Sequence, residues 1–468
     1  MTRSAIAVVL ALLVSGSASA QGFDQKAVGR AVFKELIEVN TTPSVGNTTK
    51  AAELIATRFR AAGIPAGDIA IVGPDETHKN LVVRIRGADR TRKPILLLAH
   101  LDVVEAERKD WNMDPFTFNE VDGFYYGRGT QDIKGGATTL ITSLLRMRAE
   151  RFTPSRDLIL ALTAGEEGGS PNGVQWLLAN RKELIDAEYC INVDGGGVDS
   201  EKGKPVVMNM QAAEKVYFDG KLTVTNKGGH SSLPRPDNAI NAINALARAL
   251  VKIEAYTFPV EFNEITRAYM QRSAPLRGGA LGADLKAASS VPGDPAAIKR
   301  LSEDPWFNAQ MRTTCIATLL TGGHAPNALP QSATANVNCR RLPGLTSDSL
   351  VRLLNRIIGD TNVVITIVED SPQSPASPLR ADVEAAVRAA SEAIAPNLPL
   401  VPNMETGATD GLYIRNAGIP VYGLSGIAID TDDVRMHGRD ERVNIVAFER
   451  AQEFMYRLLR TITTPVTP

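Results

Sequence analysis

The feature that most constrains the fold is an alternation of short apolar segments with amphipathic segments in the first half of the chain. Predicted strands lie at 81–85, 95–100, 158–163 and 187–193. Predicted helices lie at 26–39, 49–62, 136–150 and 174–182. Strands that alternate with helices predict an α/β fold, a mostly parallel sheet with helices on both faces. In such sheets, ligands bind beyond the carboxyl ends of the strands.

From about residue 216 the order of elements changes. The pattern predicts strands at 216–225, 313–320, 333–340 and 363–369, with helices at 237–255 and 347–358. This βαββαβ order is the split βαβ arrangement and predicts a smaller α+β domain. We expect the main domain to comprise residues 21–213 and 372–468, interrupted by a second domain at 214–371. Within the second domain, residues 256–312 are expected to form an irregular insertion.

After this second domain the first pattern returns. A Pro/Ser connector at 371–378 precedes a predicted helix at 381–394, a strand at 419–423 and a final helix at 444–460. The C-terminal stretch is therefore predicted to complete the main domain.

The N-terminus is typical of a signal peptide. Arg3 is followed by an apolar run at 5–14 and by small residues ending at Ala18-Ser19-Ala20. The run is too short to span a bilayer as a mature helix. We expect residues 1–20 to be removed and the protein to be periplasmic or secreted, without a membrane span after cleavage. The alternative is an uncleaved membrane anchor.

Charge and cysteine content exclude two classes of protein. The 51 basic and 52 acidic residues leave a net charge of −1, which offers no electrostatic reason to expect nucleic acid as a partner. Three cysteines are too few for a disulfide scaffold, and their odd number leaves at least one unpaired in a monomer.

Acidic residues and histidines follow the predicted strands. His100 and Asp102 end one strand, and Asp132 lies in a glycine-rich turn before a helix. The other candidates are Glu166 and Glu167, Asp194, and the late His437. Two imidazoles and several carboxylates suit Zn²⁺ or a similar divalent ion such as cobalt or manganese. A single His or Asp at a strand end is usually a turn or cap residue, and a Glu-Glu pair is usually on the surface. Together, these residues predict a metal site.

The spacing of these residues suggests which of them bind metal, which orient a ligand and which act as a base. His100 and Asp102 lie on the same side of a strand, so Asp102 can accept from the ring N–H of His100. Adjacent Glu166 and Glu167 cannot point the same way from an extended backbone, so one can bind metal while the other acts as a base. A carboxylate that bridges two ions about 3.5–4 Å apart would make a two-metal hydrolytic centre.

The chain resembles the co-catalytic di-zinc metallopeptidases. The motifs that carry this resemblance are AHLDVVEAERKDWNMDPFTFNEVDGFYYGRGTQDIKGG, TAGEEGGS, KGGHSS, NALP, ETGATDG and MHGRDERV, spread over residues 25–460. This group includes aminoacylase, acetylornithine deacetylase, succinyl-diaminopimelate desuccinylase, glutamate carboxypeptidase, carboxypeptidase S and carnosinase.

The resemblance implies a role for each candidate residue. His100, Asp132 and Asp194 would hold one zinc ion, and Asp132, Glu167 and His437 the other, with Asp132 bridging. Asp102 would orient His100, and Glu166 would be the general base. A cis peptide bond is implied after the bridging residue, between Asp132 and Ile133. Aspartate at 194, where many members have glutamate, resembles the dipeptidase branch.

The resemblance also assigns the second domain as a lid and dimerisation domain. His230 would reach the active site of the partner subunit in a homodimer and stabilise the oxyanion. Asn327 and Arg340 would bind the carboxylate of the substrate, and Gly407 would offer a backbone group. The long insertion resembles those of the larger members, such as the carboxypeptidase S type.

These implications predict an exported, zinc-dependent exopeptidase or N-acyl-amino-acid amidohydrolase. Its substrate would be a small peptide or N-acyl amino acid with a free carboxylate. Two alternatives remain open at this point: a biosynthetic deacylase or desuccinylase with the same chemistry, and a non-catalytic binding protein on this fold.

Overall fold

The computed structural model describes residues 22–168, 171–234 and 241–464. The predicted signal peptide, 1–20, lies outside this part of the chain. Within the described residues, no helix combines the length and apolar character needed to cross a membrane.

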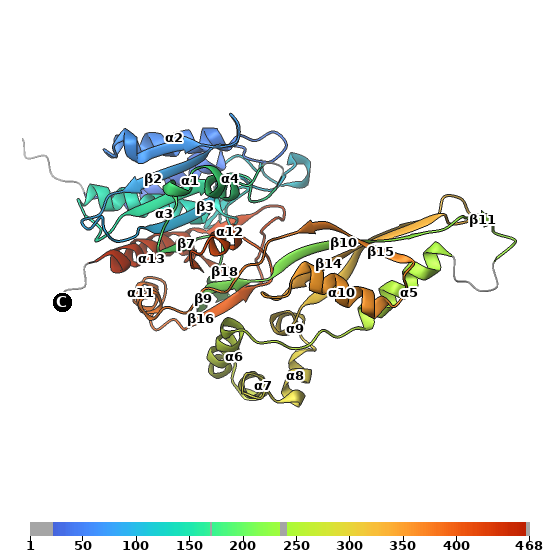
Figure 1. Ribbon diagram of the computed structural model, residues 1–468. Helices are drawn as coiled ribbons and strands as arrows, with labels where there is room; N and C mark the ends of the chain where they lie inside the picture. The colour runs from blue at the N-terminus through green and yellow to red at the C-terminus, as the bar shows by residue number, and fades with distance from the viewer. Residues whose placement is uncertain (1–21, 169–170, 235–240, 465–468) are drawn as a thin grey trace, which may run out of the picture.

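A large central sheet forms the core of the molecule (Figure 1). Among the described residues its strand order is β1-β2-β6-β3-β7-β17-β9-β8-β18, with β16 also paired to β9. These strands are β1 (Ile69–Val72), β2 (Asn80–Ile85), β3 (Ile95–His100), β6 (Leu158–Thr163), β7 (Tyr189–Asn192), β8 (Gly197–Glu201), β9 (Lys204–Glu214), β16 (Leu400–Glu405), β17 (Val421–Gly423) and β18 (Ala428–Asp430).

The middle of the central sheet is parallel and its flanks are mixed. Strands β6, β3, β7 and β17 run parallel to one another, whereas β1, β2 and β9 each pair antiparallel with a neighbour. The predicted α/β fold is therefore confirmed. The antiparallel flanks could not be read from the order of elements, because a helix that connects two strands does not settle which strands become neighbours.

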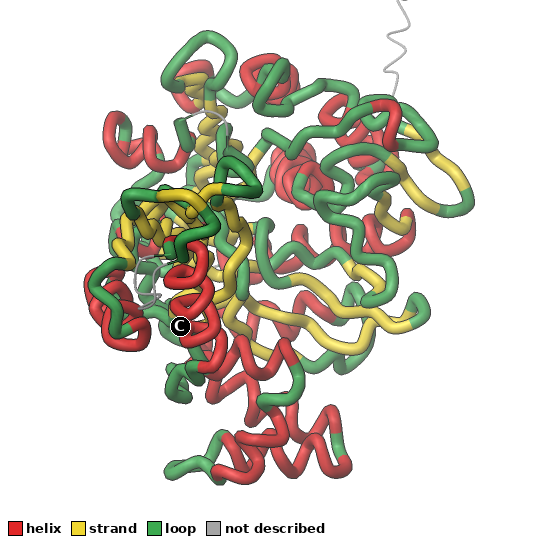
Figure 2. Tube along the Cα trace, turned by 90° about the vertical axis from the view of Figure 1, so that its right-hand side faces the viewer, coloured by secondary structure: helices red, strands yellow, loops and turns green. Residues whose placement is uncertain are grey.

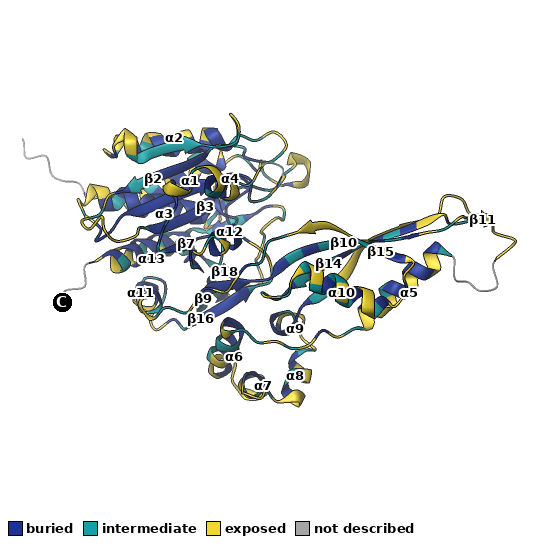
Figure 3. Ribbon diagram, in the orientation of Figure 1, coloured by how far each residue is buried: buried dark blue, intermediate teal, exposed yellow. Residues whose placement is uncertain are grey.

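Helices cover both faces of the central sheet, as predicted. One face packs on α1 (Gln25–Ile37), α2 (Thr48–Ala61), α3 (Lys134–Ala149), α11 (Ala381–Ser391) and α13 (Ile445–Thr463). The other packs on α4 (Gly173–Asn180) and α12 (Gly411–Asn416). Along β3, Leu97 faces the first layer and Leu96 and Leu98 face the second. This burial on both sides explains the continuous apolar run of that strand, and Figure 3 shows the central strands as buried.

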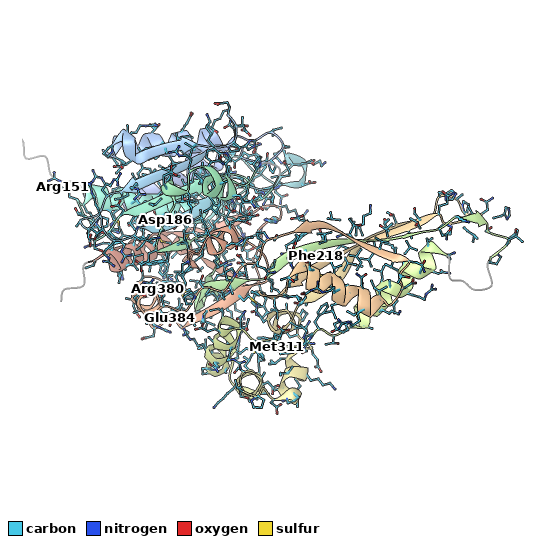
Figure 4. All side chains as sticks on the ribbon, viewed as in Figure 1. Arg151, Asp186, Phe218, Met311, Arg380 and Glu384 are labelled. Atoms are coloured by element: carbon cyan, nitrogen blue, oxygen red, sulfur yellow. A yellow bond between two sulfur atoms is a disulfide. The ribbon has the colours of Figure 1, made fainter. Side chains whose placement is uncertain are left out.

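The βαββαβ segment forms an arm that extends away from the central sheet (Figure 1) and points toward the viewer in Figure 2. Its antiparallel sheet has the order β12-β14-β10-β15, and helices α5 and α10 cover one face. Its elements are β10 (Val216–Thr225), α5 (Ala242–Ala255), β12 (Thr314–Gly322), β14 (Ser332–Arg341), α10 (Ser347–Ile358) and β15 (Val363–Asp370). Phe218, labelled in Figure 4, is fully buried in its core. The predicted order of elements is confirmed, although residues 237–240 of the predicted helix lie outside the described residues.

Two further features mark the arm. A short pair, β11 (Gly229–His230) and β13 (Ala328–Leu329), lies at its far tip (Figure 1). A disulfide joins Cys315 on β12 to Cys339 on β14, while Cys190 is free and buried in the central sheet.

The prediction that residues 256–312 are irregular is wrong. They form α6 (Glu264–Arg277), α7 (Gly279–Ala288), α8 (Pro295–Leu301) and α9 (Pro305–Met311). Aspartate caps and N-terminal prolines begin α8 and α9, which are signals of helix starts. The insertion leaves the arm and packs on the central sheet, where Val401 of β16 joins its apolar cluster. Gln310 Nε2 also donates to the backbone oxygen of Met404 at 2.8 Å.

Small elements complete the described structure. Three-residue 3₁₀ helices lie at Ala66–Asp68, Arg108–Asp110 and Lys182–Leu184. A second small sheet contains β4 (Asn119–Val121), β5 (Phe124–Tyr126) and β19 (Arg442–Asn444). It brings the residues around 441 next to the turn that contains Asp132.

Candidate metal centre and active site

His100 anchors the candidate site at the carboxyl end of β3. Its ring is buried, and its Nδ1 lies 2.9 Å from the backbone oxygen of Asp102. A carbonyl oxygen only accepts, so Nδ1 carries the proton and Nε2 is left with a lone pair for a metal. The carboxylate of Asp102, expected from sequence to hold the ring, lies farther away, with Oδ1 at 3.8 Å from Nδ1. Its Oδ2 instead accepts from the backbone N–H of Glu167 at 2.9 Å.

Asp132 lies between the two histidines. Its Oδ1 is 3.2 Å from His100 Nε2, and its Oδ2 is 3.0 Å from His437 Nε2. The peptide bond to Ile133 is cis. One carboxylate oxygen faces each imidazole, which is the arrangement that a carboxylate bridging two metal ions needs.

The other predicted ligands flank this aspartate. Asp194 Oδ1 lies 3.8 Å from His100 Nε2, and Glu167 Oε2 lies 3.1 Å from His437 Nε2. Potential ligand atoms fall within 4.8 Å of one another in two groups, His100 with Glu166 and Asp194, and His100 with Asp132 and Glu167. The structure thus brings together every metal-site residue predicted from sequence, and we call this cluster the metal centre.

The electrostatics of the metal centre show an excess of carboxylates. Burial raises the pKa of Glu166 well above its usual range, and nearby carboxylates raise it further against the opposing effect of His100. Burial likewise raises the pKa of Asp194, and the neighbouring Glu166 adds to the shift. Hydrogen bonds to Asp132 and Glu167 raise the pKa of His437 to about 10. A divalent cation among these oxygens would relieve the repulsion between them.

Glu441 positions Asp132, and sequence reasoning assigned it no role. It is fully buried and accepts from the backbone N–H groups of Gly129, Gln131 and Asp132 at 2.6–3.0 Å. Arg128 compensates its charge, with Nη1 at 2.7 Å. The only sequence signal for a role of Glu441 was its place in the MHGRDERV motif.

Asp410 is a second buried carboxylate that the sequence did not single out. Its oxygens accept from Thr163 Oγ1 at 3.2 Å and from Asn172 Nδ2 at 2.5 Å. Asn172 Nδ2 also lies 3.3 Å from the backbone oxygen of Gly165. Burial raises the pKa of Asp410 to about 6. Asp410 therefore ties the turn that carries Glu166 and Glu167 to α12.

The two predicted residues at the tip of the arm, His230 and Asn327, lie away from the metal centre of their own chain (Figure 1). His230 is exposed on β11 at the tip, with Nδ1 2.7 Å from Ser232 Oγ, and the Asn327 backbone oxygen accepts from Ser231. Arg340 lies near the end of β14 that is farther from the tip of the arm. The ten extended residues of β14 span roughly 30 Å. Asn327 and Arg340 of one chain therefore cannot meet on one carboxylate. Gly407 lies in an exposed loop after β16.

Arg340 has a cationic neighbour that the sequence did not reveal. Lys215 is buried, and its Nζ lies 3.2 Å from Thr314 Oγ1, the residue paired with Arg340 across β12 and β14. Burial, with a further contribution from Arg340, lowers the pKa of Lys215 to about 7. Within the described residues, neither cation forms an ion pair with a carboxylate, although Asp219 and Glu369 lie near enough to act on Arg340. The guanidinium of Arg340 also stacks on the ring of Tyr217, 4.6 Å from its centroid.

Comparisons with known proteins agree with this geometry. The model of a family described as peptidase family M20/M25/M40 matches residues 96–461. A probable carboxypeptidase S-like 2 of Dictyostelium discoideum is 29% identical, covering 81% of this chain and 74% of that protein. The human N-fatty-acyl-amino acid synthase/hydrolase PM20D1 is 28% identical, covering 82% and 77%.

The fold has a counterpart among solved structures. The crystal structure of an M20 family metallo-carboxypeptidase from Sulfolobus solfataricus aligns with a TM-score of 0.69 at 18% sequence identity. The alignment covers 93% of this chain and 99% of that one.

Proposed function

The chain belongs to peptidase family M20/M25/M40 and is a hydrolase of amide bonds, and from this premise we propose that two zinc ions serve its reaction. We further propose that its substrates are small peptides or N-acyl amino acids with a free carboxylate. The human relative is named an N-fatty-acyl-amino acid synthase/hydrolase, which supports N-acyl amino acids as substrates.

The placement of Asp132 between His100 and His437 carries this proposal. Asp194 and Glu167 extend the donor set on either side, which gives imidazole and carboxylate ligands of the kind that zinc accepts. Cobalt or manganese would fit the same donors. When bound, the ions would polarise the amide carbonyl and make a nearby water more acidic.

Glu166 is the proposed general base. It lies at the metal centre but is not needed as a ligand once Glu167 fills that role. Burial and neighbouring carboxylates raise its pKa, so its affinity for a proton suits removal from water and delivery to the leaving amine. Asp102 would act indirectly, because its backbone oxygen orients His100 and its carboxylate holds the backbone of Glu167.

The base of the arm is the proposed carboxylate subsite. Arg340 offers a forked donor that forms no ion pair among the described residues, although Asp219 and Glu369 lie near enough to oppose the lowering of its pKa by burial. Lys215, when protonated, adds a positive charge near it. Gly407 follows Glu405, whose backbone oxygen accepts from the Lys215 N–H at 2.9 Å. A substrate carboxylate would supply an ion-pair partner.

His230 and Asn327 are proposed to act across a homodimer. Both lie at the tip of the arm, so they can reach a metal centre only in a second copy of the chain. The outer strand β12 and α5 support a dimer, because a mostly apolar groove of about 500 Å³ lies between them. Pairing of two such edges about a twofold axis would cover this surface.

Export is proposed from two features. The signal-peptide pattern at 1–20 predicts secretion or a periplasmic location. The disulfide between Cys315 and Cys339 supports it, because disulfides persist mainly in oxidising compartments.

Hydrolysis of a matched substrate panel tests the proposal. The panel contains dipeptides, the same dipeptides with C-terminal amides, and N-acetyl and long-chain N-acyl amino acids, assayed by mass spectrometry with the zinc-loaded protein. Cleavage of free-carboxylate substrates but not of amides is the expected result. Cleavage of N-acyl amino acids alone would narrow the substrate class, and equal cleavage of the amides would refute the carboxylate subsite.

A further inference from the structure

The helical insertion forms a cavity against the edge of the central sheet, outside the metal centre. The cavity measures about 410 Å³ and lies between α6 and strands β8, β9 and β16. In Figure 1, α6 lies directly below β9 and β16. Its apolar walls are Val206, Val207, Leu276 and Val401. This volume is within the usual range for small-molecule sites.

Opposite charges enter the cavity from two different elements. Asp199 and Glu201 come from β8, and Arg277 ends α6. Across residues 22–168, 171–234 and 241–464, none of the three forms an ion pair. Burial raises the pKa of Asp199, and a hydrogen bond to Asn209, which also lines the cavity, and the charge of Arg277 oppose that shift. These charges are close enough to influence each other but are not paired.

Another arginine on the same helix behaves differently. Arg272 reaches Glu384 of α11, labelled in Figure 4, with two hydrogen bonds of 2.9 and 3.0 Å. That pair attaches the insertion to the helices of the central sheet. Attachment therefore does not require Arg277, which leaves its guanidinium available to a ligand.

The ligand that fits carries a positive and a negative charge close together beside an aliphatic group. We propose that this cavity binds a free α-amino acid with an aliphatic side chain. Its ammonium group faces Asp199 and Glu201, its carboxylate faces Arg277, and its side chain packs on the valines and Leu276. Binding does not depend on the proposed function, but the role of the amino acid as a reaction product does.

A connection leads from this cavity toward the metal centre. Asp199 pairs with Ile429 across β8 and β18, and Thr431 both lines the cavity and donates its N–H to Ser200 at 3.0 Å. The chain then continues from Thr431 to His437. An amino acid bound here therefore contacts the start of the loop that carries a proposed zinc ligand, which suits feedback by product.

Equilibrium binding of L-leucine to the full-length, zinc-loaded protein tests the proposal. We expect Arg277→Gln and Asp199→Asn to weaken leucine binding at this site about tenfold or more, since each removes a charge-assisted contact. Lys286→Gln is the matched control, because it removes an exposed positive charge from α7 of the same insertion. Arg340→Met reports separately on leucine bound at the metal centre.

Two further probes define the ligand class. 4-Methylpentanoate, which has the leucine skeleton without the ammonium group and no amide to hydrolyse, and L-leucinamide, which lacks the carboxylate, are both expected not to displace leucine from this cavity. Leucine binding that is unchanged in both Arg277→Gln and Asp199→Asn, or that is lost only in Arg340→Met, would overturn the proposal. A protein that binds leucine in this way but hydrolyses nothing in the panel would contradict the proposed function and leave this site standing.

Discussion

The metal centre is rich in carboxylates, whereas the base of the arm holds two basic side chains that form no ion pair among the described residues. At the carboxyl end of β3, Asp132, Glu166, Glu167 and Asp194 crowd around two histidines. At the base of the arm, Lys215 and Arg340 lie side by side without an ion-pair partner among the described residues. Each region thus offers charged groups that its proposed ligand would bind.

Buried charges elsewhere in the molecule show that the chain can compensate them when it needs to. Glu214 and Arg415, both fully buried, form an ion pair at 2.5 Å between the root of the arm and α12. Arg128 and Glu441 form another buried ion pair, and Glu441 also accepts from the backbone N–H of Asp132. Leaving a buried charge unpaired is costly, so the crowded carboxylates of the metal centre support the proposed cations. At the base of the arm, Arg340 is partly buried and has Asp219 and Glu369 nearby without an ion pair, which leaves it able to bind the proposed carboxylate.

The largest expected effect concerns the proposed base. Glu166→Gln keeps the shape of the side chain but removes its capacity to carry a proton. We expect kcat to fall by about 10²–10⁴-fold, the range for loss of general acid–base catalysis, while bound zinc is unchanged. Steady-state kinetics and metal analysis of the same preparation check this, and near-native turnover would refute the assigned role.

The next effect concerns Arg340. Arg340→Met removes the forked donor, and we expect KM for a free-carboxylate substrate to rise about 10–100-fold, the value of a hydrogen bond to a charged group. The C-terminal amide of that substrate should be affected little. An equal change for both substrates would mean that Arg340 supports the arm and does not select the carboxylate.

A smaller effect is expected for Lys215. Lys215→Met should raise KM for carboxylate substrates by about tenfold or less, because the cation acts from behind Arg340. Lys221→Met is the matched control, since Lys221 is exposed farther along β10. If the control raises KM as much as Lys215→Met does, the effect is not specific to the subsite.

The pH dependence of KM distinguishes the contribution of Lys215 from that of Arg340. Because its pKa is lowered to about 7, Lys215 is protonated below that pH and neutral above it. Carboxylate binding should therefore weaken as the pH rises through 7, and KM should rise. Arg340 stays charged over this pH range. The other ionisable groups that act on Arg340 are Tyr217 and Asp219 on β10 and Glu369 on β15. A KM profile measured from pH 6 to 8 should flatten in Lys215→Met, and an identical slope in both proteins would contradict the assignment.

The sequence predicted elements well where the apolar pattern was strong. The bounds of β6, β10 and α10 agree with the predicted ranges. The helices of the insertion were missed because their apolar spacing is weak, although Asp294-Pro295 and Asp304-Pro305 did signal helix starts. Strand β9 was also missed, because its run KPVVMNMQAAE lacks a clear alternation.

The same distinction applies to the site. Predicted ligands such as His100 and Asp194 follow buried strands, so the fold class alone placed them at one edge of the sheet. Glu441 and Lys215 gave no such signal, because their importance depends on burial and on partners far away in sequence. The separation of Asn327 from Arg340 likewise required the three-dimensional arrangement of the arm.

A zinc titration tests the central claim most directly. Metal-depleted protein would be titrated with zinc while bound metal per chain and hydrolysis of a free-carboxylate substrate are measured together. The account predicts two zinc ions per chain, with activity absent before the titration and restored by it. Full activity in the metal-free protein, or failure of the folded chain to bind zinc, would contradict it.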